Sequence, residues 1–219
     1  MMRKTTHFKT LIIIGLLIAV LTVSVFANPF KMSGKSRTKV FRLPPGLYLF
    51  EINNKGFSKF NFVVKNEAGV VTDVLASGVG PFKGRKVVAV NKPADAEEEN
   101  IKVKRYMEAT EADGEWVASV FSTIAAKEGE NEFSGETNTM DATPTFKLEE
   151  GKYLFTVGHK GGRNFSAYLI DSRGRRVAEL ANSVGHFTDS TTVNIPAEGT
   201  YIVQIKASGK WNVSFGKTQ

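Results

Sequence analysis

The sequence predicts an all-β protein in which two tandem antiparallel β-sandwich domains follow an N-terminal apolar signal or anchor helix. Three observations lead to this fold class. The chain opens on a long apolar segment, a stretch of fifty residues recurs once at a constant spacing, and each copy divides into short strands separated by turn residues. The 219 residues are 42% hydrophobic and 23% charged, a composition typical of globular proteins.

The first segment, residues 1–27, has the three parts of a signal peptide. Arg3, Lys4 and Lys9 give a basic start without an acid, residues 11–27 are almost wholly apolar, and small side chains precede a candidate cleavage site after residue 27. An uncleaved anchor is the alternative, because about 17 apolar residues are the lower limit for spanning the hydrocarbon layer. We therefore expect an exported protein, whether secreted, periplasmic or on the cell surface, that contacts a membrane only through residues 11–27 if the leader stays.

Composition excludes several kinds of chemistry. The chain has no cysteine, which rules out disulfides, thiol nucleophiles and cysteine-bound metals, and it has only three histidines. The net charge of +7 falls to +4 without the three basic groups of the leader, and the excess is too diffuse for a nucleic-acid groove. We predict no nucleic-acid partner.

The internal repeat is the strongest signal in the sequence. Residues 41–90 align with residues 146–195 at a constant offset of 105, and sixteen of the fifty positions are identical. Both tryptophans, Trp116 and Trp211, close their copies at matching places. The predicted domains are residues 36–121 and 145–219, joined by an acidic, flexible linker over residues 122–144 that is rich in small and polar residues. Copies this small bury little surface alone, so we expect them to pack against each other or against a neighbouring chain.

The strands follow from alternation. Tyr48, Phe50 and Ile52 stay apolar in both copies, whereas Leu47 becomes Lys152 in the second, which predicts one buried and one wet face. Residues 66–69 and 171–174 end on glycine and are typical of reverse turns. Each copy should contain seven or eight strands.

These elements support a family resemblance. The order Gly-x-Tyr-x-Phe, then Asp171 to Gly174, then Pro-Ala-x-Gly-Thr-Tyr-x-Val (Pro196 to Val203), then a closing aromatic strand resembles the bacterial pre-peptidase C-terminal (PPC) module. The resemblance covers about 75 residues of each half. It implies a jelly-roll fold and a non-catalytic role on secreted proteins. The sequence departs from that family at Trp116 and Trp211, where a smaller aromatic residue is usual.

The sequence offers little material for catalysis, and we predict neither an enzyme nor a cofactor. His186 could be grouped with Asp189 and Ser190, but neighbours this close in sequence rarely converge in triad geometry. The histidines are therefore expected in turns or on the surface. The acidic stretch from Asp95 to Asn100 could hold calcium, and a solvated loop is the alternative.

Candidate ligand-contact residues are the aromatic residues without an aromatic counterpart in the other copy, Phe57 and Tyr168, and the basic cluster of Arg173, Arg175 and Arg176. A second basic cluster spans Lys83 to Lys86. Such clusters could bind an extracellular polymer such as an acidic polysaccharide, or they could simply keep the surface soluble. We therefore expect a binding or structural component of the cell envelope or the extracellular medium. The alternatives are a pair of carbohydrate-binding modules, or a surface-filament subunit that self-associates through open sheet edges.

Overall fold

Short strands with alternating side chains form every regular element in the part of the chain that the structure describes. This computed structural model describes residues 30–33, 37–94 and 101–218, and these contain seventeen strands and no helix. The described residues therefore contain no helix long and apolar enough to cross a membrane. The predicted leader (1–27) and the predicted calcium loop (95–100) lie outside the described residues.

The first half of the chain forms two four-stranded antiparallel sheets, with the orders β1-β8-β3-β6 and β2-β7-β4-β5. Its strands are β1 (Phe30–Ser33), β2 (Arg37–Leu43), β3 (Gly46–Asn54), β4 (Lys59–Lys65), β5 (Val71–Val79), β6 (Phe82–Val90), β7 (Val103–Thr110) and β8 (Glu115–Ser122).

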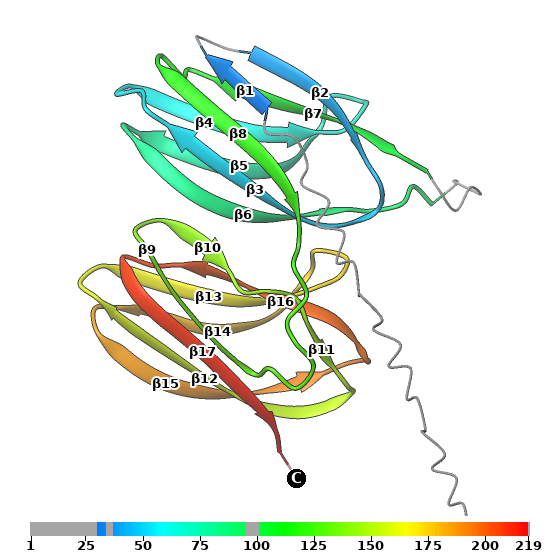
Figure 1. The fold of residues 1–219 in the computed structure, drawn as a ribbon, viewed down its shortest axis with the longest axis vertical. Helices are drawn as coiled ribbons and strands as arrows, with labels where there is room; N and C mark the ends of the chain where they lie inside the picture. The colour runs from blue at the N-terminus through cyan, green and yellow to red at the C-terminus, as the bar shows by residue number, and fades with distance from the viewer. Residues whose placement is uncertain (1–29, 34–36, 95–100, 219) are drawn as a thin grey trace, which may run out of the picture.

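The second half repeats this arrangement, with the orders β9-β17-β12-β15 and β10-β16-β13-β14, and β11 also pairs with β16. Its strands are β9 (Glu132–Thr137), β10 (Met140–Ala142), β11 (Phe146–Leu148), β12 (Gly151–Gly161), β13 (Asn164–Asp171), β14 (Arg176–Val184), β15 (Phe187–Ile195), β16 (Gly199–Lys206) and β17 (Gly209–Lys217). Figure 1 shows the two halves one above the other along the long axis.

The strand orders of the two halves are equivalent, and both are the order of a jelly roll, which pairs eight strands in two sheets. The registers also repeat: Gly46 lies opposite Val90 in β3–β6, and Gly151 lies opposite Ile195 in β12–β15. The β-bulges that interrupt β4–β5 recur at the same places in β13–β14. The structure thus shows the sequence repeat as a repeat of topology and register.

The matched apolar residues fill two separate cores, as their alternation predicts. Phe50 and Trp116 are fully buried in the first core, and Phe155 and Trp211 occupy the same places in the second. The turn glycines Gly69 and Gly174 have φ values of +77° and +79°, a conformation that side chains with a Cβ rarely adopt.

The segment predicted as a flexible linker, residues 122–144, is partly β-structure. β9 pairs with β17 and β10 pairs with β16, so these strands are the counterparts of β1 and the start of β2. The prediction was wrong over residues 132–142 because β9 is held by backbone pairing with only one well-buried side chain, Phe133. A polar composition therefore hid a strand at the edge of a sheet.

Two further predictions, that one side chain faces solvent and that a histidine lies in a turn or on the surface, are wrong because both side chains are buried. Leu47, expected on the wet face, is 9% exposed because the second half packs over it. His159, expected in a turn or on the surface, lies in β12 and is 1% exposed.

Candidate functional site at the junction of the two halves

The predicted ligand-contact residues separate into two places. Tyr168 lies in β13, Arg173 and Arg175 lie in the turn after it, and Arg176 begins β14. Phe57 lies in the β3–β4 turn of the other half and is 79% exposed. It is the only aromatic side chain among the large exposed hydrophobic residues that the structure describes, so no strip of rings surrounds it.

The arginines of the β13–β14 turn are held by contacts within the hairpin. The buried Asp171 carboxylate accepts the backbone N–H groups of Arg173 and Arg175 at 2.9 Å, and it pairs with the Arg175 guanidinium at 2.8 Å. Arg176 lies over the Tyr168 ring, 3.7 Å from its centroid, in a cation–π contact. These groups shape the turn before any ligand arrives.

This hairpin also docks on the first half. The Asn91 side chain donates a hydrogen bond to the Arg173 carbonyl at 3.2 Å, and a Cβ added to Gly174 would lie 2.6 Å from that of Ala89. Since β6 has nine residues at about 3.3 Å each, roughly 27 Å separate this contact from the end of β6 that adjoins the Phe57 turn. The five predicted residues therefore do not form one site.

The junction follows the outward side of β6. Alternate residues from Lys83 to Asn91 contact the second half, and Val87 joins Leu47, Ile170 and Ile202 in a third apolar cluster. In β15 of the second half, the counterparts of Lys83, Arg85 and Val87 are the polar residues Thr188, Ser190 and Thr192. The residues that the second half contributes to the cluster, Ile170 and Ile202, lie in β13 and β16. The outer face of one sheet in the first half thus packs on the outer face of the non-equivalent sheet in the second. This contact confirms the expectation that the copies pack together.

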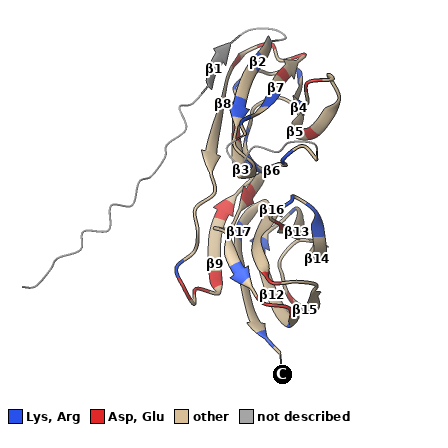
Figure 2. Ribbon diagram, turned by 90° about the vertical axis from the view of Figure 1, so that its right-hand side faces the viewer, with Lys and Arg blue, Asp and Glu red and all other residues tan. Residues whose placement is uncertain are grey.

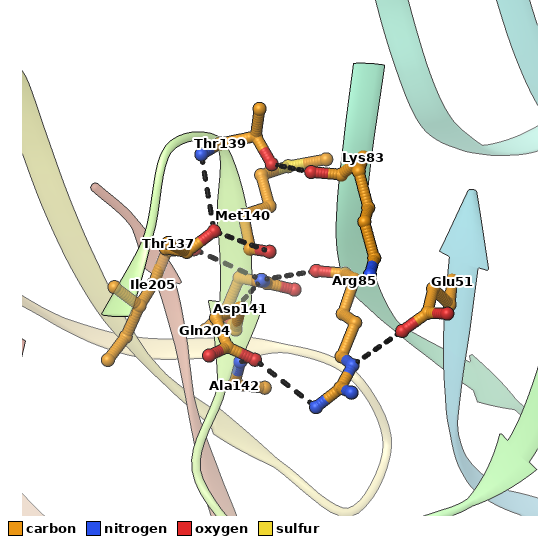
Figure 3. Close-up of polar contacts among 10 residues, drawn as sticks. All are labelled: Glu51, Lys83, Arg85, Thr137, Thr139, Met140, Asp141, Ala142, Gln204 and Ile205. Carbon is orange, nitrogen blue, oxygen red and sulfur yellow. Dashed lines mark hydrogen bonds and ion pairs between the residues drawn. The ribbon is translucent and has the colours of Figure 1, made fainter. Parts of the chain in front are cut away.

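One buried carboxamide pairs with the free edge of β6. Gln204 Oε1 accepts the Val87 N–H at 2.7 Å. Nε2 donates to the Arg85 carbonyl at 3.1 Å and to the Asp141 carbonyl at 2.6 Å (Figure 3). The side chain therefore presents to β6 the donor and acceptor that a neighbouring strand would present. Thr139 adds a hydrogen bond from its hydroxyl to the Lys83 carbonyl.

Charged groups surround this contact. The Arg85 guanidinium pairs with Glu51 at 2.9 Å, within its own half, and lies 3.7 Å from Asp141 of the second half (Figure 3). Burial raises the pKa of Asp141, and Arg85 partly offsets this effect. Two recesses of about 390 and 330 Å³ flank the Arg85–Asp141 pair, and both residues line each recess.

A second charged group lies at the open edge between β5 and β6. Burial raises the pKa of Asp73 and lowers that of Lys86, and each charge partly offsets the shift of the other. Arg176 of the second half lies near enough to lower the pKa of Lys86 further. Both basic clusters noted in the sequence therefore contribute residues to the junction, and Figure 2 shows the basic start of β14 there in blue.

The buried histidine has a structural role. His159 Nδ1 is 2.7 Å from the Gly185 carbonyl, and Nε2 accepts the Ser208 N–H at 3.4 Å. In the first half Asn54 occupies the same place, is 2% exposed and donates to the Gly80 carbonyl at 3.1 Å. Because both ring nitrogens of His159 are engaged by the backbone, this imidazole is not arranged as a general base. The described residues contain no group of three side chains suited to a metal ion.

Comparisons with known proteins assign no family. No protein-family model and no curated protein matches the sequence. Similar solved structures include a triple jelly-roll protein of an archaeal virus turret (TM-score 0.32, 12% identity, 90% of this chain and 60% of that one). They also include the CBM22 tandem domain of Paenibacillus barcinonensis Xyn10C (0.27, 9%, 92% and 99%) and the PBSX exported protein XepA (0.27, 8%, 89% and 87%). The chain thus spans less than two thirds of the viral protein, and TM-scores this low carry no functional argument.

The sequence contained one signal for the junction that the repeat concealed. Tyr201 to Ile205 of β16 are buried without interruption, unlike the alternating β7 of the first half. Residues 201–205 are apolar except at one position, and a nearly continuous apolar run is typical of a strand covered on both faces. Gln204 interrupts that run and is the residue that sequence reasoning missed.

Proposed function

We propose that this chain is an exported, non-enzymatic protein whose two jelly-roll domains act together as one binding or structural unit of the cell envelope or extracellular medium. The observation that carries the proposal is the sheet-on-sheet junction, in which an apolar cluster and the Gln204 hydrogen bonds join two separate cores. A junction with its own buried residues favours a fixed arrangement of the two domains over two freely moving modules. Export is inferred from the leader pattern of residues 1–27.

A non-catalytic role is supported by how the polar groups are used. The buried His159 is engaged by backbone groups of two neighbouring turns, at Gly185 and Ser208. Asp171 satisfies backbone N–H groups of its own turn, and Gln204 satisfies the edge of β6. Buried polar groups that serve the fold in this way are not free to act on a substrate.

Assembly into a filament through repetition of the junction is disfavoured. The junction joins two different faces, so copies of the chain could add end to end into a filament if the two outer faces of the pair resembled the faces that meet at the junction. The free face of β12 and β15 instead carries Lys152 and Thr192, where the first half has Leu47 and Val87. At the opposite end of the pair, the outer face of the β4–β7 sheet in the first half carries a Lys65–Glu108 ion pair. Polar residues therefore stand at the positions of three apolar docking residues, since Leu47, Val87 and Ile170 correspond to Lys152, Thr192 and Lys65.

The proposal is tested by expressing the full chain with a C-terminal tag in a bacterial host. We expect export, a new N-terminus at residue 28 or a membrane-anchored form, and recovery of an extracellular polymer or protein with the chain. Retention in the cytoplasm would contradict the export part. A hydrolytic activity lost in His186→Ala would contradict the non-enzymatic part.

A further inference from the structure

The junction contains a groove that both halves line. We call it the junction groove and define it as the two recesses on either side of the Arg85–Asp141 pair. Glu132 and Ser134 of β9 line one recess, and Glu136 lines the other. These alternate residues share one side of β9, so the groove follows that strand. Figure 2 shows the acidic residues of β9 in red.

Trp211 supplies a donor that the protein does not use fully. This residue lines the larger recess and is 4% exposed, and its indole Nε1 is buried without a hydrogen bond of regular geometry. It is close enough to Asp141 to lower the pKa of that carboxyl slightly against the effect of burial. Its ring lies against Gly135, where an added Cβ would be 2.6 Å from Cζ2. A buried donor of this kind is stabilised by any acceptor that enters the recess.

The charges of the groove select against anions. Its cations are Lys83 and Arg85, whereas its walls carry the following five carboxylates: Glu51, Glu130, Glu132, Glu136 and Asp141. An acidic polysaccharide would meet a net negative wall, which lowers its affinity. The predicted acidic-polymer ligand therefore does not suit this groove.

The mixture of donors and acceptors also selects against a simple cation. The Trp211 N–H and the Arg85 guanidinium can only donate, so they need acceptor oxygens, and a lysine ammonium has none to offer. The Glu132 and Asp141 carboxylates can only accept when ionised. A ligand dense in hydroxyl groups satisfies both sets, because each hydroxyl donates one hydrogen and accepts through its oxygen.

From this geometry we propose that the junction groove binds a neutral saccharide chain, with Trp211 and Arg85 donating to sugar hydroxyls and Asp141 and Glu132 accepting from them. The two recesses share their central residues, so a chain of more than one sugar can occupy both. The inference rests on the proposed binding role and names its ligand class. The site depends on the fixed junction, because Arg85 belongs to the first half and the other three residues belong to the second.

The test uses the purified exported chain and a panel of neutral tetrasaccharides, namely cellotetraose, maltotetraose, chitotetraose and mannotetraose. Binding is measured by calorimetry up to about 10 mM sugar, a concentration that would saturate a site with a Kd of about 1 mM. We expect at least one sugar to bind. Hexalysine and polyglutamate serve as cationic and anionic probes, and we expect neither to compete for the site.

Two variants locate the site. Trp211→Phe removes the N–H and keeps a ring, and we expect it to raise Kd about five- to tenfold, the loss of one hydrogen bond. Trp116→Phe is the matched control, because it makes the same change in the first core and leaves Trp211 as the single tryptophan. In that control we expect unchanged affinity and a shift of Trp211 emission on binding.

Glu132→Gln is the second site variant, since Glu132 is exposed and its replacement does not threaten folding. We expect weaker sugar binding in this variant with an unchanged circular dichroism spectrum. The proposal is overturned if no sugar binds, if hexalysine binds in place of sugar, or if both site variants bind as tightly as the parent. Such a result would leave export and partner recovery intact, so failure of this inference is distinguishable from failure of the proposed function.

Discussion

Replacing Gln204 with alanine tests how the two halves are joined. The change removes three hydrogen bonds of 2.6 to 3.1 Å and leaves the Val87 N–H and the carbonyls of Arg85 and Asp141 without that partner. At about 1 kcal/mol for each lost hydrogen bond in a buried site, the free energy of unfolding should fall by about 3 kcal/mol. Gln204→Glu should cost more, because it places a charged acceptor against two carbonyl oxygens.

The measurement is urea unfolding of the purified chain, followed by tryptophan fluorescence, which reports on one tryptophan in each half. We expect the parent to unfold in one transition and Gln204→Ala to unfold earlier, with the two halves separating into two transitions. Glu108→Ala is the matched control: Glu108 faces Val63 across β4–β7 as Gln204 faces Tyr168 across β13–β16. Its ion pair with Lys65 is partly exposed, so the cost should be about 1 kcal/mol or less. A loss below about 1 kcal/mol in Gln204→Ala, no larger than the control, would refute the argument that this carboxamide locks the junction.

Three other substitutions test separate parts of the structure. Gly135→Ala should lower the free energy of unfolding by about 1–3 kcal/mol, because its Cβ would lie 2.6 Å from the Trp211 ring. His159→Leu keeps most of the volume but leaves two backbone groups unpaired, and it should cost about 2–4 kcal/mol, whereas the same change at the exposed His186 should cost less than about 0.5 kcal/mol. Asp141→Asn should be at least as stable as the parent at pH 7, with an advantage that shrinks as the pH falls.

The sign of the pH effect follows from burial. Because folding raises the pKa of Asp141, the folded state binds this proton more tightly than the unfolded state. The parent therefore gains stability from Asp141 as the pH falls from 7 through the raised pKa toward the unfolded value of about 3.9. Asparagine has no such gain, so the difference between the two proteins should narrow over this range.

Each of these predictions has an outcome that contradicts it. A Gly135→Ala protein as stable as Ser134→Ala, an exposed neighbour, would mean that β9 does not lie against the Trp211 ring. An equal loss in the free energy of unfolding for His159→Leu and His186→Leu would mean that His159 is not buried as described. A stability difference between Asp141→Asn and the parent that widens on acidification would mean that burial does not control this carboxyl.

The interior of each half was predictable from the sequence because its signals are local. Alternation placed Tyr48, Phe50 and Ile52 inside, and all three are buried. The glycines of the 66–69 and 171–174 turns marked positive φ values correctly. These features need only a pleated strand with one covered face and a turn whose positive φ favours glycine.

The junction was not predictable from the same reasoning, because comparison of the copies favours what they share. Leu47 and Val87 dock the second half, while their counterparts Lys152 and Thr192 face outward. The differences between the copies therefore mark the contact, and the identities mark the cores. Strand β9 escaped notice for another reason, since pairing through the backbone at a sheet edge leaves little trace in side-chain pattern.

The central claim, that the second half covers the open edge of β6, is tested most directly by amide hydrogen exchange at Val87 in the intact purified chain. Strand β6 ends its own sheet, so its outward amides would exchange quickly if nothing covered them. We predict that the Val87 amide is protected and that Gln204→Ala removes this protection, while the outward amides of the edge strand β5 exchange quickly in both proteins. Rapid exchange at Val87 in the parent would contradict the account.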